Sequence, residues 1–191
     1  QGHIKIHDPE SGAVFVNKRN AIHYENMSIA LAESVANQGQ GFINSMAFGN
    51  GGTSVDPTGI ITYLTPNSTG TNASLYNQTY SKVVDDRSVT NLDPQRNKIE
   101  TRHVNGTNYT DVLVTCLLDY GEPNGQDAVD QASQANSLYV FDELGLVSYS
   151  PNGTGKLLTH VVFHPVQKSL NRLVQIDYTV RVQSLTGFNE G

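Results

Sequence analysis

The stretch Val174-Gln-Ile-Asp-Tyr-Thr-Val-Arg-Val182, VQIDYTVRV, decides the fold class of this 191-residue chain. Its first, third, fifth, seventh and ninth residues are aliphatic or aromatic, and the residues between them are polar. Successive side chains of a β-strand point to opposite faces of the sheet, so this alternation predicts a strand with one face on a core and one in water. We therefore expect a half-buried strand over Leu173–Gln183.

Shorter apolar stretches recur along the rest of the chain. We expect strands at Phe42–Phe48, Ile60–Leu64, Tyr80–Val84, Lys98–Val104, Asp111–Leu118, Ser137–Phe141 and Lys156–Phe163. About eight strands separated by polar loops are typical of a β-sandwich or a jelly roll. The sequence therefore predicts a mainly β, single-domain protein over residues 1–191, with long surface loops at 65–78 and 122–136.

The N-terminal part of the chain predicts a hairpin and one helix. Residues 3–7 alternate, residues 8–12 (DPESG) have turn chemistry, and residues 13–16 return as a second strand. Apolar side chains then recur at helical spacing over about 26–37, with Asn26 as the expected N-cap and Gly39 as the expected stop. We expect the hairpin Gly2–Val16 to serve as an interaction arm, and its deletion to leave a folded domain.

The glycine-rich segment 48–59, FGNGGTSVDPTG, raises the question of a phosphate-binding loop. A Walker loop needs G-x-x-x-x-G-K-[ST], but Thr53 follows Gly52 here. A dinucleotide fingerprint needs G-x-G-x-x-G at the start of a helix, whereas position 54 is Ser54 and Pro57 follows closely. We therefore interpret the segment as a turn in which the glycines and Asn50 adopt positive φ.

No arrangement of reactive side chains in the sequence points to catalysis, a cofactor or a metal. His160 and His164, like His3 and His7, are spaced by four residues within expected strands, where about 13 Å separates them. Cys116 lies in an apolar stretch and is expected to be a buried thiol. The neighbours Asp142 and Glu143 should point to opposite faces of a strand, which is unsuitable for a general acid and base.

Two weaker possibilities remain open for the acidic and the asparagine side chains. Asp85 with Asp86, or Asp127 with Asp130, could supply oxygen ligands to calcium, although solvated carboxylates are the default. Seven N-x-[ST] triplets would suit a secreted glycoprotein. They begin at Asn26, Asn67, Asn72, Asn77, Asn105, Asn108 and Asn152.

The overall composition is acidic and poor in charge. The net charge is −6, and charged residues make up 16% of the chain, against about 25% in an average globular protein. The 12 Lys and Arg residues form no basic stripe, which argues against a nucleic-acid partner. The sequence has no apolar run long enough for a membrane span, so we expect no membrane partner.

Five segments together resemble a family of small virion structural proteins of contractile-tailed bacteriophages of the T4-like and cyanophage kind. They are NAIHYENMSIALAESVA (20–36), FINSMAFGNGGTS (42–54), ASLYNQTYSKVVDD (73–86), YVFDELGLVS (139–148) and LLTHVVFHPVQKSLNRLVQIDYTVRV (157–182). The resemblance implies a β-rich domain present in many copies in the virion. Its partners would be capsid, neck, tail or baseplate proteins and copies of itself, and it carries over no functional residues.

The sequence thus favours a non-enzymatic virion protein, either a capsid decoration subunit or a neck, collar or tail component. Two alternatives stay open: a carbohydrate- or receptor-binding β-sandwich of a phage fibre, and the secreted N-glycosylated protein. The chain has no Trp, the residue that a carbohydrate site would favour, but its nine Tyr could partly substitute.

Overall fold

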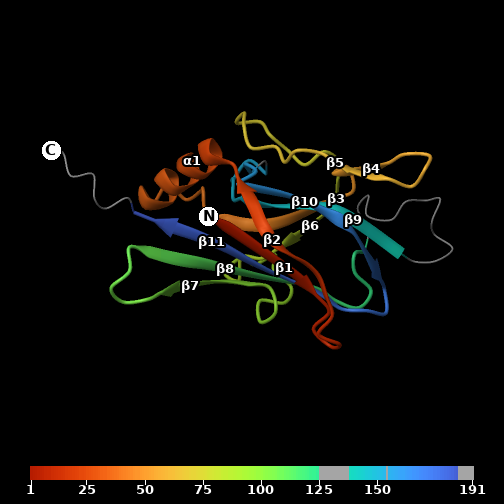
Figure 1. Ribbon diagram of the computed structural model, residues 1–191. Helices are drawn as coiled ribbons and strands as arrows, with labels where there is room; N and C mark the ends of the chain where they lie inside the picture. Colours follow the sequence, from red (N-terminus) through yellow and green to blue (C-terminus); the bar gives the residue numbers. More distant parts are fainter. Residues whose placement is uncertain (125–137, 154, 185–191) are drawn as a thin grey trace.

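A computed structural model describes residues 1–124, 138–153 and 155–184 of the chain (Figure 1). This part contains eleven strands and one helix, so the expected mainly β, sandwich-like fold with a single helix is confirmed. In chain order the elements are β1 (Gly2–His7), β2 (Val14–Ile22), α1 (Tyr24–Val35), β3 (Ile43–Gly49), β4 (Thr53–Val55), β5 (Ile61–Tyr63), β6 (Gln78–Val83), β7 (Lys98–His103), β8 (Tyr109–Leu118), β9 (Leu138–Ser148), β10 (Thr159–Ser169) and β11 (Val174–Gln183).

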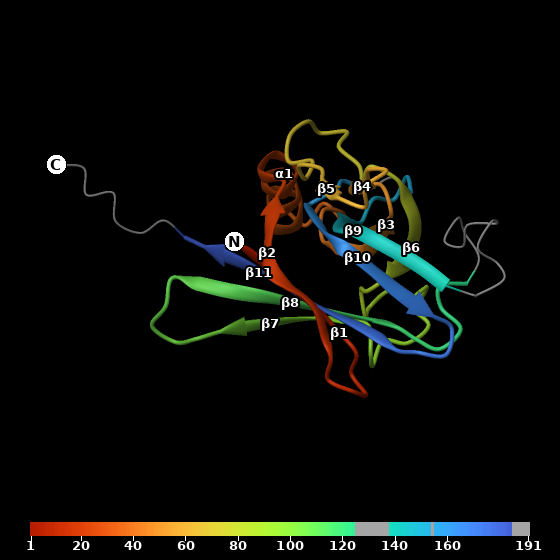
Figure 2. The ribbon, with the colours of Figure 1, turned by 45° about the vertical axis from the view of Figure 1, so that its right-hand side comes forward.

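Nine of the strands form one curled antiparallel sheet in the order β6-β3-β9-β10-β2-β1-β11-β8-β7, and β4 pairs with β5 in a separate hairpin. Strand β2 holds the two halves together. It pairs with β1 along its length, but with β10 only through Ile22 and Ala21. The sheet folds over at this point, so that β1, β11, β8 and β7 lie beneath the other half, and α1 lies at one end between them (Figures 1 and 2).

The core fills the space between the two halves of the sheet. Phe48, Phe141 and Phe163 come from three different strands of one half, and Phe141 contacts each of the other two rings edge to face. From the other half, β11 contributes four of the five apolar residues of its alternating face, which are buried as the sequence predicts. The fifth, Val182, is 38% exposed, because β11 runs past the end of the core there.

Two strands are longer than their sequence indicates. Strand β9 extends from Leu138 to Ser148 and includes the acidic pair that was expected to follow it, and β10 continues through Pro165 to Ser169. The pairing of β9 with β10 shifts register between Val162 and Val166, which accommodates the proline.

The N-terminal hairpin is not a peripheral arm, which corrects the sequence-based expectation. Strand β1 lies inside the sheet between β2 and β11, and the side chains of Ile4 and Ile6 are fully buried. Removing it would open the sheet at its centre, so we now expect that deletion of Gly2–Val16 would not leave a folded domain. Only the turn between the two strands, Asp8–Ala13, is left as a surface loop.

Helix α1 begins two residues earlier than expected. Its N-cap is His23, whose Nδ1 accepts the backbone N–H of Asn26 at 3.1 Å. Asn26 lies within the first turn, fully buried, and its side-chain amide donates to the carbonyl of Leu157. The helix ends at Val35, and the chain then turns through positive φ at Asn37 and Gly39.

Candidate functional site

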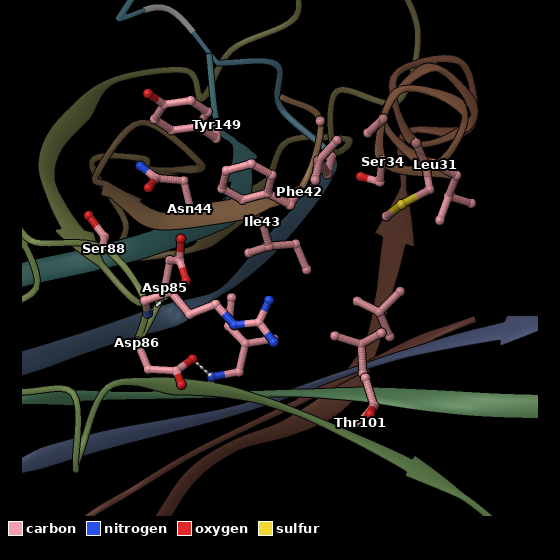
Figure 3. A pocket seen from close by; sticks show the side chains of 18 of the residues that line it. Leu31, Ser34, Phe42, Ile43, Asn44, Asp85, Asp86, Ser88, Thr101 and Tyr149 are labelled. Carbon is pink, nitrogen blue, oxygen red and sulfur yellow. Dashed lines mark hydrogen bonds between the residues drawn. The ribbon is translucent and has the colours of Figure 1, made fainter. Parts of the chain in front are cut away.

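A groove with a volume of about 810 Å³ lies between α1 and the open end of the curled sheet. Figure 3 shows Leu31 and Ser34 of α1 on one side of it and Asp85, Asp86 and Ser88 on the other. We call this hollow the α1 groove. Its other lining residues are Met27, Ala30, Gly41, Phe42, Ile43, Asn44, Arg87, Val89, Ile99, Thr101, Val112, Tyr149, Leu158, Val180 and Val182.

The wall of the α1 groove is mainly apolar, and several of its side chains are left in water. Leu31 and Phe42 are each 41% exposed, and Val89 is almost entirely exposed. The rings of Phe42 and Tyr149 stack with their centroids 4.9 Å apart, forming a flat aromatic wall. Contiguous exposed apolar surface in a hollow is typical of a binding site for another molecule, because covering it removes apolar area from water.

One end of the groove carries charged groups. The carboxylate of Asp85 accepts the backbone N–H of Arg87 at 3.0 Å, and that of Asp86 accepts the N–H of Ile99 at 3.2 Å. Both carboxylates therefore hold the loop between β6 and β7 in place. Arg87 forms no salt bridge with any residue in the described part of the chain, which leaves its guanidinium available to an incoming anion.

The glycine-rich segment is fixed by close packing instead of by positive φ, which corrects the sequence-based interpretation. Among its glycines only Gly59, in the turn between β4 and β5, has a positive φ of 88°. At Gly49 an added Cβ would lie 2.4 Å from the carbonyl oxygen of Asn77 and 2.5 Å from Glu143. At Gly52 the nearest atoms are less close, at 3.0 Å for Val162 and 3.1 Å for Asp142, so the requirement for glycine is strongest at Gly49.

The acidic pair of β9 explains this close approach. Asp142 accepts the backbone N–H groups of Gly52 and Thr53 at 2.8 and 2.9 Å. Glu143 accepts four hydrogen bonds, two on each carboxylate oxygen. The donors are the backbone N–H groups of Gly51, Tyr76 and Asn77 and the Nε2 of His160.

The hydrogen bonds determine the tautomer of His160. Its Nδ1 accepts the backbone N–H of Asn67 at 2.8 Å, so the proton of the neutral ring is on Nε2, which donates to Glu143 at 2.9 Å. Burial alone would raise the pKa of the Glu143 carboxyl. The hydrogen bonds from His160 and from the three backbone N–H groups outweigh it and keep this pKa below its ordinary value.

Glu143 and His160 therefore join the loop 65–77 and the glycine-rich segment to the sheet. Both side chains have no exposed surface, so a substrate could not reach them as they stand. The pair resembles part of a catalytic arrangement in composition, but its hydrogen-bonding capacity is used within the protein. We assign it a structural role.

Lys168 is a second buried charged group, which the sequence analysis did not single out. Its Nζ donates to the carbonyls of Asp119, Glu122 and Ser169, at 2.6–2.9 Å, and its side chain is fully buried. Burial lowers the pKa of this ammonium to about 8, although the carboxylates of Glu122 and Asp119 oppose the effect. The lysine holds the turn after β8 against β10.

The other candidate residues of the sequence are dispersed. Cys116 is buried in β8 as expected, and burial raises its pKa to about 12. His7 of β1 bonds to Asp177 at 2.8 Å, and His164 of β10 bonds to the hydroxyl of Tyr63 at 3.2 Å, so each has its own partner. Within the described ranges no three His, Cys, Asp or Glu side chains are placed to share a metal ion.

The remaining candidates are the calcium and glycosylation residues. Asp127 and Asp130 lie outside the described residues. Of the seven triplets, the one at Asn26 is inaccessible in the folded protein, because that side chain is buried. Exposed asparagines begin five of the others, and Asn67 is partly buried.

No family model, curated protein or solved structure matches this chain. In the part of the chain that the structure describes, no helix has the length and apolar character needed to cross a membrane.

Proposed function

We propose that this protein is a non-enzymatic structural component of a tailed-bacteriophage virion, which acts by assembling with other virion proteins and with copies of itself. The observation that carries the proposal is the exposed apolar α1 groove, about 810 Å³ in volume and open at the end of the sheet. The five segments that resemble virion proteins give the proposal its particular setting.

The chemistry of the groove supports assembly better than catalysis. Its exposed side chains are those of Leu31, Phe42 and Val89, which gain free energy by leaving water. Its acidic side chains are engaged with backbone N–H groups of their own loop. Among the described residues, the groove therefore offers apolar area to a partner and the unpaired guanidinium of Arg87 at its end, but no activated nucleophile.

The surface composition is consistent with repeated contact between chains. Only 16% of residues are charged, so covering this surface with another chain removes fewer charged groups from water than in an average globular protein. The glycine-rich segment and the loop 65–77 are fastened to the sheet by Asp142, Glu143 and His160. Fastened loops lose less conformational entropy when they are covered by a partner.

Native mass spectrometry of the protein purified from its natural source tests the proposal. The expected result is an unmodified subunit near 20.8 kDa in defined multimers or in complexes with other virion proteins. A monomer carrying hexose-sized mass increments would contradict it, and would favour the secreted glycoprotein instead.

A further inference from the structure

We propose that the α1 groove of each copy is filled by residues 185–191 of a second copy. The inference rests on the proposed function, since it names the partner through which copies of the protein assemble.

The last described strand leads to the rim of the groove. Val180 and Val182 of β11 both line it, and Val182 is already 38% exposed. Seven residues, LTGFNEG, follow Ser184 in the sequence. An extended segment of that length reaches about 23 Å, which is enough to cross a groove of this size.

The composition of this segment matches the groove. Leu185 and Phe188 are its two large apolar residues, and Gly187 between them allows the backbone to present both to one surface. Glu190 supplies an anion for the guanidinium of Arg87, which has no ion pair within the described residues. Aromatic and aliphatic anchors in a concave site usually carry most of the binding energy of such contacts.

The direction of the chain favours a second copy over the same molecule. Ser184 is held on both sides: its N–H donates to the carbonyl of Asn108 at 2.9 Å, and its carbonyl accepts the side-chain amide of Asn108 at 3.0 Å. These bonds continue the line of β11, which points out of the domain (Figure 1). A segment that continues this line leaves its own domain, so we assign it to the groove of a second copy.

A reciprocal exchange also doubles the area that two copies bury between them. Specific interfaces bury about 800 Å² per partner. If two copies exchange segments about a two-fold axis, each copy buries both its own segment and its own groove. The same contact between segment and groove then occurs twice in the dimer. The exposed rim residues Leu31, Phe42 and Val89 would be covered in the same step.

Sedimentation velocity of the full chain over a range of concentrations tests this inference. Wild-type protein should form dimers, and Phe188→Ser should weaken the dimer by about 30-fold or more, as expected for loss of a central anchor. Leu31→Lys should weaken it to a similar extent by placing a charge in the groove. Asn189→Ser and Val35→Lys are matched controls, the second on the exposed side of the same helix, and should behave as wild type.

Mixing the two weakened variants separates exchange between copies from other contacts. The Phe188→Ser copy keeps an intact groove and the Leu31→Lys copy keeps an intact segment, so the mixture should form a heterodimer that neither variant forms alone. A monomeric wild type, a Phe188→Ser protein that dimerises normally, or a mixture that remains monomeric would each overturn the inference. These results concern purified protein, so they are distinguishable from a failure of the proposed function, which would appear as absence of the wild-type chain from virions.

Discussion

Replacing Glu143 with Gln should destabilise the protein strongly while leaving its shape almost unchanged. The glutamine oxygen can take the place of one carboxylate oxygen and keep the bonds from Gly51 and Asn77. Its NH₂ group then faces two donors, the N–H of Tyr76 and the Nε2–H of His160, and can accept from neither. A buried donor left without an acceptor costs about 1–3 kcal/mol, so we expect a loss of about 2–5 kcal/mol in the free energy of unfolding.

Urea unfolding followed by circular dichroism measures this loss. Glu100→Gln is the matched control, because Glu100 makes an exposed ion pair with Lys98 on the edge strand β7. Such pairs contribute about 0–1 kcal/mol. A loss below 1 kcal/mol for Glu143→Gln, or equal losses for the two variants, would refute the role given to this carboxylate. Hydrogen exchange at the amide of Tyr76 should also accelerate in Glu143→Gln alone.

The same carboxylate should make stability depend on pH in acid. The pKa of Glu143 is lower in the folded protein than its ordinary value of 4.5. Its contribution is therefore complete above that ordinary value and is lost as the pH falls through the folded pKa. The urea midpoint of the wild type should decrease below about pH 4.5 more steeply than that of Glu143→Gln, and parallel profiles would contradict this assignment.

Three further perturbations test the fold. Lys168→Met should lower the free energy of unfolding by about 2–4 kcal/mol, because three carbonyls lose their shared donor. Lys98→Met should lower it little, and equal urea midpoints for the two variants would refute this role of Lys168. Gly49→Ala should lower the free energy of unfolding by about 1–3 kcal/mol through steric overlap, and it should accelerate hydrogen exchange most at Asn77. Gly59→Ala should show only the local strain of a positive φ. Deleting residues 1–7 should abolish cooperative thermal unfolding, and a cooperative transition in the truncated chain would show that β1 is dispensable.

Much of the fold could be predicted because the hydrophobic pattern repeats with period two. The alternation in 174–182 identified β11, and the spacing of apolar residues identified α1. The boundaries were harder where a polar residue has a partner distant in sequence. Nothing local to His23 indicates that it caps α1. Asp142 and Glu143 looked like the end of a strand because their backbone N–H donors lie 66 to 92 residues away.

The groove could not be predicted from the sequence, because it has no sequence motif. Its lining comes from α1, from the residues around β3, from the loop after β6 and from β7, β8 and β11, which meet only when the sheet curls. The same applies to the glycine-rich segment. Glycine at position 49 is required by the close approach of Asn77 and Glu143, and this approach can be recognised only after the fold is known.

The central claim, that this protein acts by assembling into virions through the α1 groove, is tested most directly by counting its copies in particles purified from its natural source. Quantitative mass spectrometry of gradient-purified particles should find many copies of the wild type and of Val35→Lys, and a marked depletion of Leu31→Lys. Absence of the wild-type chain from the particles, or incorporation of Leu31→Lys at the wild-type level, would contradict the claim.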